Sequence, residues 1–202
     1  SGGTYVGTED LTYIVEIDAI AAIGAASQTT GSGLDDCTSG GTYTGPADLT
    51  YVIEVAEEAV IGTATITGAG LDDCTSGGTY SGTTDLTYVV EVDAAAGTDT
   101  FKWSKDGGST WEATSVAMTG AAQELDNGVT VTFTATTGHT LGDLWTIEAK
   151  VDQLMWSDDG GSSWDGTGIP MTGAAQSLNN GVTVTFGAVL GHTKGDQWTF
   201  TA

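Results

Sequence analysis

Residues 127–133 read Asn-Gly-Val-Thr-Val-Thr-Phe, and the same seven residues recur at 180–186. Apolar and polar side chains alternate along both stretches, which is typical of a β-strand with one buried face and one solvated face. The Asn-Gly pair before each strand predicts a tight hairpin turn, because both residues tolerate a positive φ. Leu86–Asp93 alternates in a similar way. These stretches predict an all-β protein.

Two families of internal repeats account for most of the chain. Residues 101–149 align without gaps with 154–202, and most of the aligned positions are identical. The other family contains Ser-Gly-Gly-Thr-Tyr followed by Asp-Leu-Thr-Tyr, and its copies begin at Ser1, Ser39 and Ser76. Duplicated units of this kind usually stack as equivalent structural modules.

The repeats predict tandem immunoglobulin-like β-sandwich modules, some of them incomplete. Residues 79–149 are near the size of one complete sandwich, and residues 150–202 duplicate its back half. Residues 1–78 hold two short β repeats, about 1–38 and 39–75. Because a half module has open strand edges, we expect strands from neighbouring subunits to complete it. The chain also opens in the middle of a repeat, which predicts an N-terminal truncation.

The composition excludes several classes of function. The 202 residues contain 27 Asp and Glu against 4 Lys and Arg, and the formal net charge is −23. All four cations are lysines, so no arginine is present. A nucleic-acid-binding protein needs cations that displace phosphate counterions, and this class is therefore excluded. No apolar run approaches the roughly 20 residues of a membrane span, so no membrane span is expected.

Two eight-residue stretches share a loop motif. Residues 104–111 read Ser-Lys-Asp-Gly-Gly-Ser-Thr-Trp, and residues 157–164 read Ser-Asp-Asp-Gly-Gly-Ser-Ser-Trp. Both resemble the Asp-box, a hairpin loop of sialidases, other propeller glycosidases and many unrelated β proteins. In such a loop the Asp accepts backbone N–H bonds, the glycines supply a positive φ and the Trp packs beneath. We expect a structural role for Ser104, Asp106, Gly108, Trp111, Ser157, Asp159, Gly161 and Trp164.

Nothing in the sequence predicts an enzyme. A sialidase resemblance would imply an arginine cluster that grips the substrate carboxylate, and the chain has no arginine. A propeller needs at least four blades, whereas only two such units are present. Other glycosidases need two convergent carboxylates roughly 5–10 Å apart, but adjacent acids on a strand point to opposite faces. His139 and His192 occupy equivalent places in a repeated turn, which indicates turn stabilisation.

Cys37 and Cys74 occupy equivalent places in successive repeats. Three alternatives remain open for them: a disulfide between the two, which an extracellular setting would favour, an intermolecular disulfide, or two free buried thiols.

Acid-rich loops at Asp35-Asp36, Asp72-Asp73 and Asp158-Asp159 offer the oxygen ligands that Ca²⁺ takes. Their spacing matches no calcium-loop pattern, so simple solvated charge is the favoured interpretation. We assign no metal ligand and no cofactor.

A wider resemblance involves residues 79–94 together with the stretches that begin at Thr100 and Met118. This part of the sequence resembles tandem β modules of phage tail-fibre and virion proteins and of large prokaryotic surface proteins. The resemblance implies a structural or adhesive role and an extracellular location, at a cell surface or on a virion. It carries no catalytic residues with it.

The leading hypothesis is a non-enzymatic structural subunit of an extracellular fibre, either a phage tail-type appendage or a prokaryotic surface filament. Its partners would be further copies of itself, which pair strands into a polymer. Candidate interface residues are Tyr5, Tyr43 and Tyr80, with Tyr13, Tyr51 and Tyr88; ordinary core packing explains them equally well.

The alternative is a carbohydrate-binding or adhesion module in which surface tryptophans stack on glycans. Trp111 and Trp164 are the first candidates, because they lie beside the Asp-box loops. Because these tryptophans recur at equivalent positions of the two aligned repeats, ordinary packing in a hydrophobic core also explains them.

Overall fold

The protein is described by a computed structural model that covers residues 3–4, 6–8, 12, 14 and 21–202. Within these residues the structure contains strands, turns and loops but no helix, which confirms the predicted all-β fold. It follows that no helix in the described part of the chain could cross a membrane.

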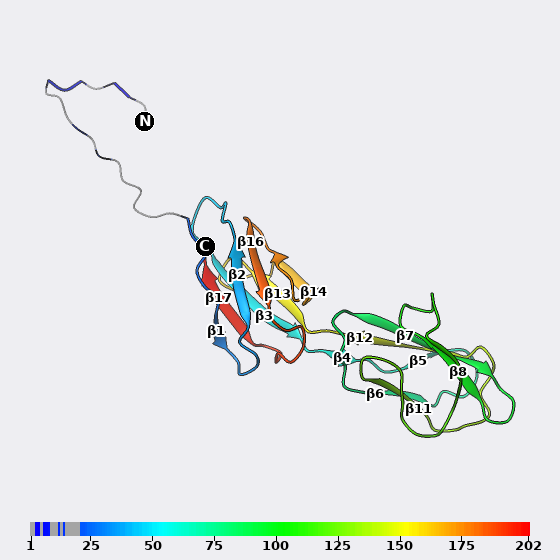
Figure 1. Ribbon diagram of the computed structural model, residues 1–202. Helices are drawn as coiled ribbons and strands as arrows, with labels where there is room; N and C mark the ends of the chain where they lie inside the picture. The colour runs from blue at the N-terminus through cyan, green and yellow to red at the C-terminus, as the bar shows by residue number, and fades with distance from the viewer. Residues whose placement is uncertain (1–2, 5, 9–11, 13, 15–20) are drawn as a thin grey trace.

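Two modules lie one after the other, and each has its own hydrophobic core (Figure 1). The outer module is built from two separate parts of the chain, residues 24–57 and 152–202. The inner module, residues 60–151, lies between these two parts in the sequence. The C-terminus lies at the end of the outer module that faces away from the inner one. The inner module is therefore an insertion into the outer module.

The outer module has a five-stranded sheet in the order β1-β17-β3-β13-β14 and a three-stranded sheet in the order β15-β16-β2. Its strands are β1 (Ser27–Thr30), β2 (Cys37–Gly41), β3 (Thr50–Glu57), β13 (Gln153–Ser157), β14 (Gly166–Pro170), β15 (Gln176–Ser177), β16 (Val182–Phe186) and β17 (Gln197–Thr201).

The inner module repeats this arrangement. One sheet has the order β4-β12-β7-β8-β9, with β5 also paired to β12, and the other has the order β10-β11-β6. Its strands are β4 (Val60–Ile61), β5 (Thr65–Thr67), β6 (Cys74–Gly78), β7 (Leu86–Ala94), β8 (Thr100–Ser104), β9 (Ala113–Ala117), β10 (Gln123–Glu124), β11 (Val129–Phe133) and β12 (Leu144–Lys150).

Each module combines one front segment and one back segment. The front segments are residues 24–57 and 60–94, and the back segments are residues 100–150 and 153–202. Among the described strands, those of a front segment pair only with strands of a back segment. Thus β3 lies between β17 and β13, β7 lies between β12 and β8, and β2 and β6 pair with β16 and β11. A front segment has no strand pairing of its own.

This pairing corrects the boundaries expected from the repeats. Residues 39–75 are not one unit, because β3 belongs to the outer module and β4 to the inner one. Residues 79–149 lack β4, β5 and β6 and so do not form a complete sandwich. Residues 150–202 are not an open half module, because β1, β2 and β3 pair with their strands. Strands from a neighbouring subunit are not needed to complete either module.

The physical reason is that equivalent copies are similar in sequence, so a linear alignment cannot tell which front segment pairs with which back segment. In the inner module β7 and β8 are joined by a short loop, and a short loop costs little closure entropy. Once that module has formed, it brings the ends of β3 and β13 together, where Glu57 is the register partner of Gln153. The nesting therefore follows from chain connectivity.

Local structure follows the sequence closely. Asn127 and Asn180 both adopt φ 50°, and each begins the predicted turn before β11 or β16. Alternate residues of these two strands are buried, as their pattern predicts. Gly128 has a second reason to be glycine, since an added Cβ would lie 2.1 Å from the Thr79 carbonyl oxygen.

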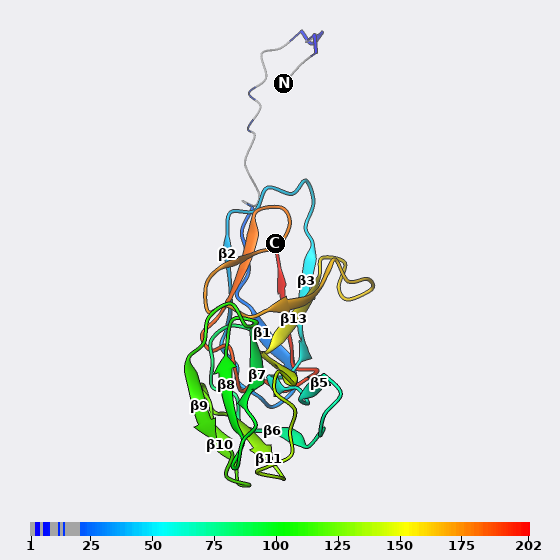
Figure 2. The ribbon, with the colours of Figure 1, turned by 90° about the vertical axis from the view of Figure 1, so that its right-hand side faces the viewer.

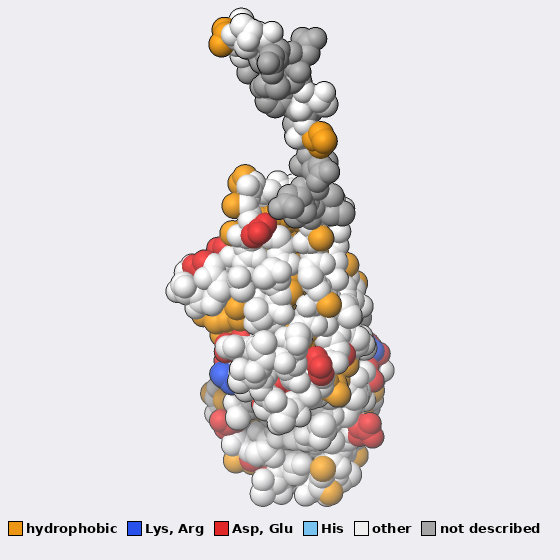
Figure 3. Space-filling view, turned by 90° about the vertical axis from the view of Figure 1, so that its left-hand side faces the viewer, with side chains coloured by type: hydrophobic (Ala, Val, Ile, Leu, Met, Phe, Trp, Pro, Cys, Tyr) orange, Lys and Arg blue, Asp and Glu red, His pale blue; other side chains and the backbone are white. Residues whose placement is uncertain are grey.

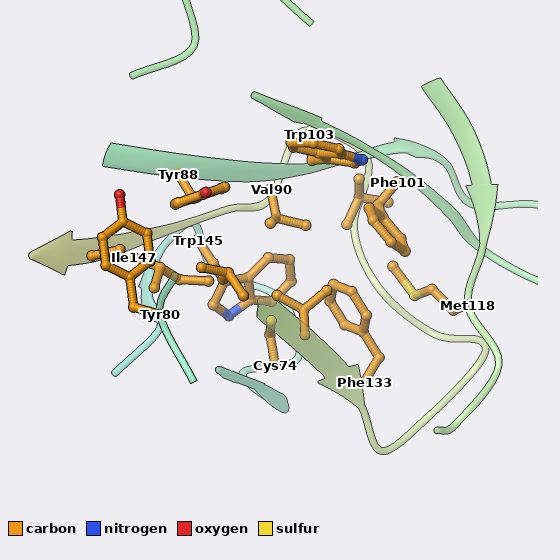
Figure 4. Close-up of a cluster of buried hydrophobic side chains, with 14 of the residues drawn as sticks. Cys74, Tyr80, Tyr88, Val90, Phe101, Trp103, Met118, Phe133, Trp145 and Ile147 are labelled. Carbon is orange, nitrogen blue, oxygen red and sulfur yellow. The ribbon is translucent and has the colours of Figure 1, made fainter. Parts of the chain in front are cut away.

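Figure 4 shows how the two sheets of the inner module share one core. Trp145 of β12 lies against Phe133 of β11, with ring centroids 5.2 Å apart in an edge-to-face arrangement. Cys74 of β6 packs in the same cluster. In the outer module Trp198 and Phe186 make the equivalent contact at 5.3 Å. Edge-to-face aromatic pairs stabilise a core beyond their buried area.

The chain passes twice between the modules, from β3 to β4 and from β12 to β13 (Figure 1; Figure 2 views the protein from the side of the inner module). These two connections are tied together. The Ala59 N–H donates to Asp152 Oδ1 at 2.6 Å, which links the incoming connection to the outgoing one. The Asp152 N–H donates to the Val189 carbonyl. Val189 packs against both cores. The junction is thus held by hydrogen bonds and by a shared apolar contact.

Candidate functional site

A network of polar side chains in the inner module surrounds the buried His139. Its Nδ1 lies 2.9 Å from Asp99 Oδ2, and its Nε2 lies 2.8 Å from Asp73 Oδ1. The His139 backbone N–H also donates to Asp99 Oδ2. Phe133 and Trp145 pack edge-on against the imidazole, whose side chain is fully buried. We call His139, Asp99, Asp73, Asp72 and Trp145 the His139 cluster.

The Asp72-Asp73 pair connects the front segment to this cluster. Asp73 Oδ2 accepts the Ala135 N–H at 2.6 Å, and Asp72 Oδ1 accepts the Trp145 indole Nε1–H at 3.0 Å. These carboxylates precede β6, whereas their donors lie in or after β11 and in β12. The adjacent acids therefore fasten the front segment to the back segment.

The geometry favours a protonated His139. Neutral imidazole has one N–H, whereas here both ring nitrogens face carboxylate oxygens, so only the cation can donate to both. Burial opposes the charge, but the hydrogen bonds to Asp73 and Asp99 outweigh it and raise the pKa of His139. Burial likewise opposes the charge of Asp99, and the hydrogen bonds from His139 outweigh it and lower the pKa of that carboxyl.

The outer module repeats the arrangement as the His192 cluster: His192, Asp152, Asp36, Asp35 and Trp198. His192 Nδ1 and Nε2 each lie 2.9 Å from a carboxylate oxygen, of Asp152 and Asp36 respectively. Trp198 Nε1 donates to Asp35 Oδ1 at 2.8 Å. In this cluster Asp152 has an additional role, because its Oδ1 also accepts the junction hydrogen bond described above.

These clusters are built to hold segments together. The imidazoles are enclosed and both nitrogens are engaged, so neither ring has a free position for a substrate. Sequence reasoning placed the two histidines in stabilising turns but interpreted the Asp-Asp pairs as solvated or calcium-binding. A usable signal was that Asp-Asp-Cys occurs in both complete front segments while His and Trp recur together in both back segments.

The Asp-box residues form self-contained loops. In the inner module Ser104 Oγ donates to Asp106 Oδ1 at 2.6 Å and accepts the Gly108 N–H at 3.0 Å. Asp106 also accepts the backbone N–H and the hydroxyl of Thr110. In the outer module Ser157, Asp159, Gly161 and Ser163 make the equivalent bonds.

These hydrogen bonds stabilise the ionised carboxylates. Bonds from Ser104 and Thr110 hold the pKa of Asp106 well below its usual range. Bonds from Ser163 and Ser157 lower the pKa of Asp159 to about 2. Each carboxylate therefore accepts hydrogen bonds from its own loop at any ordinary pH.

Each Asp-box loop also covers the central front strand of its module. The Gly107 N–H donates to the Thr87 carbonyl at 3.0 Å, and the Gly160 N–H donates to the Thr50 carbonyl at 2.9 Å. Gly108 lies over Val89 in the same way that Gly161 lies over Val52. The loops thus connect back segment to front segment on the outer side of the large sheet.

The two Asp-box tryptophans differ in their surroundings. The Lys102 ammonium lies 4.0 Å from the centroid of the Trp111 ring, a cation–π contact that occupies one face. Trp164 is 36% exposed. Trp164 is therefore the more accessible of the two candidate sugar platforms.

Among the described residues, no three His, Cys, Asp or Glu side chains are grouped so as to hold a metal ion. In two of the three acid-rich loops, at Asp35-Asp36 and Asp72-Asp73, the carboxylates accept hydrogen bonds from His and Trp side chains. In the third, Asp158 accepts the Asn179 side-chain amide.

The cysteines are free thiols, one in each core, and the predicted alternative of a disulfide between them is corrected. Cys37 of β2 is the register partner of Phe186, and Cys74 of β6 is that of Phe133. Burial, with the nearby aspartates, raises the pKa of each thiol to about 12. A thiol must ionise to react, so both are inert in the folded state.

We expect neither thiol to react with an aromatic disulfide reagent at neutral pH in the native protein, and both to react in concentrated urea. Counting the protein thiols that react with the reagent, with and without urea and in the absence of reductant, measures this directly. Rapid reaction of the native protein would contradict the buried positions. No reaction after unfolding would indicate a disulfide.

The tyrosines proposed for an interface lie mostly inside the modules. Tyr80 is buried in the inner core, and Tyr43 packs against the outer core. Their hydroxyls donate to the carbonyls of Thr84 and Ala47, four residues further along. Tyr5 lies outside the described residues.

The other tyrosines that the sequence suggested for an interface are likewise either buried or outside the described residues. Tyr51 and Tyr88 are fully buried, and Tyr13 lies outside the described residues.

Two hollows adjoin the junction between the modules. One, of about 570 Å³, is lined by Lys194, whose ammonium pairs with Glu57 Oε1 at 2.9 Å. The other, of about 580 Å³, is lined by Asp152 and His192, which are bonded to each other. Lys194, Asp152 and His192 are thus already paired within the protein.

Comparisons with protein-family models, with curated proteins and with solved structures gave no match to this chain.

Proposed function

We propose that this protein is a non-enzymatic structural subunit of an extracellular fibre, in which immunoglobulin-like modules are stacked end to end. The observation that carries the proposal is the nesting of the two modules. A module inserted into another is held by two chain connections rather than one, and the junction here adds the Asp152 hydrogen bond and the Val189 contact. Two tied connections restrict bending, which suits a rod.

The use of polar side chains also supports a structural role. The His139 and His192 clusters and both Asp-box loops each contribute hydrogen bonds that join a front segment to a back segment. The acidic surface fits an extended assembly in solution. In Figure 3 acidic side chains are spread over the face with few basic ones between them. With a net charge of −23, neighbouring rods would repel one another.

The nesting changes how subunits would be joined. Self-polymerisation was expected because the half modules seemed open, and the two modules described here are closed within one chain. Open half modules therefore do not supply the contact between subunits.

The alternative, a carbohydrate-binding module, depends on the exposure of Trp164. A glycan array with the native protein and Trp164→Ala tests it. Binding that is lost in the variant would favour this alternative over a purely structural subunit.

The proposed function is tested by electron microscopy of the native source material with gold-labelled antibodies against the inner module. We expect the label to lie along fibres outside cells or on virions. Label confined to the cell interior, or to compact single particles, would contradict the proposal. Antibodies against an unrelated surface protein of the same material provide the control for access.

A further inference from the structure

Asp152 is a buried carboxylate that serves both the junction and the His192 cluster. It lies in the connection between β12 and β13 and is 1% exposed. Its Oδ1 accepts the Ala59 N–H at 2.6 Å. Its Oδ2 accepts the His192 backbone N–H at 3.0 Å and lies 2.9 Å from His192 Nδ1. The hydrogen bond that ties the two connections together therefore shares its acceptor group with a histidine.

His192 supplies the positive charge beside this carboxylate. Its side chain is fully buried, and its two ring nitrogens face oxygens of Asp152 and Asp36. Only the imidazolium can donate to both oxygens, because neutral imidazole has one N–H. The position of Asp152 thus depends on the charge of His192.

No other group around His192 replaces that charge. Lys150 and Lys194 line the neighbouring hollow, but the Lys194 ammonium pairs with Glu57, and within the described residues neither lysine pairs with Asp152. The remaining titratable groups near His192 are acids or neutral groups: Asp35 and Asp196, whose carboxylates accept N–H groups of the outer module, Glu58 and Tyr80, which line the hollow beside His192, and the Cys37 thiol.

Loss of the His192 proton would leave two carboxylates with one N–H between them. The unprotonated nitrogen then presents its lone pair to a carboxylate oxygen. A buried carboxylate is unfavourable once its cation is lost, and Asp152 borders a surface hollow of about 580 Å³. Rotation of the Asp152 side chain toward this hollow hydrates the carboxylate and removes Oδ1 from the Ala59 N–H.

The inner module contains the same cluster without the link to the junction. Asp99 accepts the His139 backbone N–H and faces His139 Nδ1, as Asp152 does for His192. Within the described residues no hydrogen bond joins Asp99 to the outer module, and the short loop between β7 and β8 stands where the outer module carries its insertion. His139 is therefore a matched control for His192.

We propose that His192 is a pH-sensitive switch of the junction between the modules. With the imidazolium in place, Asp152 holds the Ala59 N–H and the two modules move as one body. When the proton is lost, this hydrogen bond opens and the modules move independently. His192 acts through Asp152 and is thus a positioning residue. The inference rests on the proposed rod, whose stiffness the switch regulates.

The test compares the full chain with His192→Gln, and with His139→Gln as the matched control. Residual dipolar couplings of the backbone amides give one alignment tensor when the modules move together and two when they do not. At about pH 5, below the ordinary pKa of histidine, we expect one tensor for the native chain and for His139→Gln, and two for His192→Gln. Amide exchange at Ala59 should be roughly tenfold faster in His192→Gln than in the native chain at the same pH, because its hydrogen bond opens more often.

A titration of the native chain gives a second measurement that does not depend on the folding of a variant. The Cε1–H chemical shift of His192 reports the charge of the ring, and the pH is raised until that shift changes. We expect the second tensor to appear over the same pH range. Asp152→Asn keeps the acceptor oxygen without the charge, so it should keep one tensor across this range.

Three results would overturn the inference. One is a single tensor in His192→Gln with a folded outer module, and another is a single tensor in the native chain after His192 has lost its proton. The third is two tensors in His139→Gln, which would show that the uncoupling does not depend on Asp152. These measurements report on the junction alone, whereas antibody labelling of fibres tests the proposed function, so the failure of one can be told from the failure of the other.

Discussion

A polypeptide of residues 60–151 should fold cooperatively by itself, and one of residues 79–149 should not. The longer piece contains every strand of the inner module, from β4 to β12. The shorter piece lacks β6 and with it the five register pairs that join β6 to β11. It also loses Asp73 and leaves Asp99 and His139 without their third partner. Removing one member of a buried charged group costs about 3–5 kcal/mol, against a total stability of about 5–15 kcal/mol for a typical protein.

Near-ultraviolet circular dichroism and urea unfolding followed by tryptophan fluorescence measure this difference. The matched control is the outer module without its insertion, in which Glu57 is joined to Asp152 through Ala95-Ala96-Gly97-Thr98, the loop that connects β7 to β8. In the inner module this loop joins Ala94 to Asp99, which are equivalent to Glu57 and Asp152 of the outer module. We therefore expect the control to fold. Cooperative folding of residues 79–149 would show that the nested pairing is wrong.

His139→Gln should destabilise the inner module by about 3–5 kcal/mol, since the buried Asp99 and the partly buried Asp73 then lose their shared cation. His192→Gln is the matched control, and it should affect the outer module instead. Urea unfolding followed by the NMR signals of Val131 and Val184 reports on the two modules separately. Equal loss of stability in both modules from either variant would contradict the separation of the two cores.

The same cluster predicts an acidic optimum of stability for the inner module. The pKa of His139 is raised on folding, so its contribution is complete below the unfolded value of about 6.5 and is lost as the pH rises through the folded value. The pKa of Asp99 is lowered, so its contribution is complete above about 3.9 and is lost as the pH falls through the folded value. Stability should be greatest between about pH 4 and 6.5.

Urea midpoints of the Val131 signal at about pH 5, 6.5 and 8 measure this dependence below the pH at which the unfolded Cys74 thiol ionises, about 8.5. We expect the midpoint to fall toward pH 8 in the native protein and to stay nearly level over the same range in His139→Gln. A midpoint of the native protein that does not change with pH would mean that His139 is neutral in the folded state.

The sequence by itself determined the features that depend on neighbouring residues. The alternation at residues 129–133 and 182–186 gave two real strands, and Asn127 and Asn180 begin the turns that their Asn-Gly pairs predict. The hydrogen bonds of the Asp-box loops also formed as expected, because Asp106 and Asp159 find their partners within four residues, whereas Trp164 is 36% exposed and does not pack beneath its loop as predicted. Such features need no distant contact, so a short stretch contains all of their information.

Tertiary structure alone decided which copies pair. His139 meets Asp99 across 40 residues and Asp73 across 66, whereas His192 meets Asp36 across 156. Equivalent copies are similar in sequence and offer similar pairing surfaces, so sequence similarity cannot choose among them. Connectivity makes the choice, since the front and back segments joined by the shortest loop close first and leave the remaining pair to close around them. This is why the repeats predicted strands and loops correctly and left the state of the thiols open, but did not predict the nested modules or the His–Asp clusters.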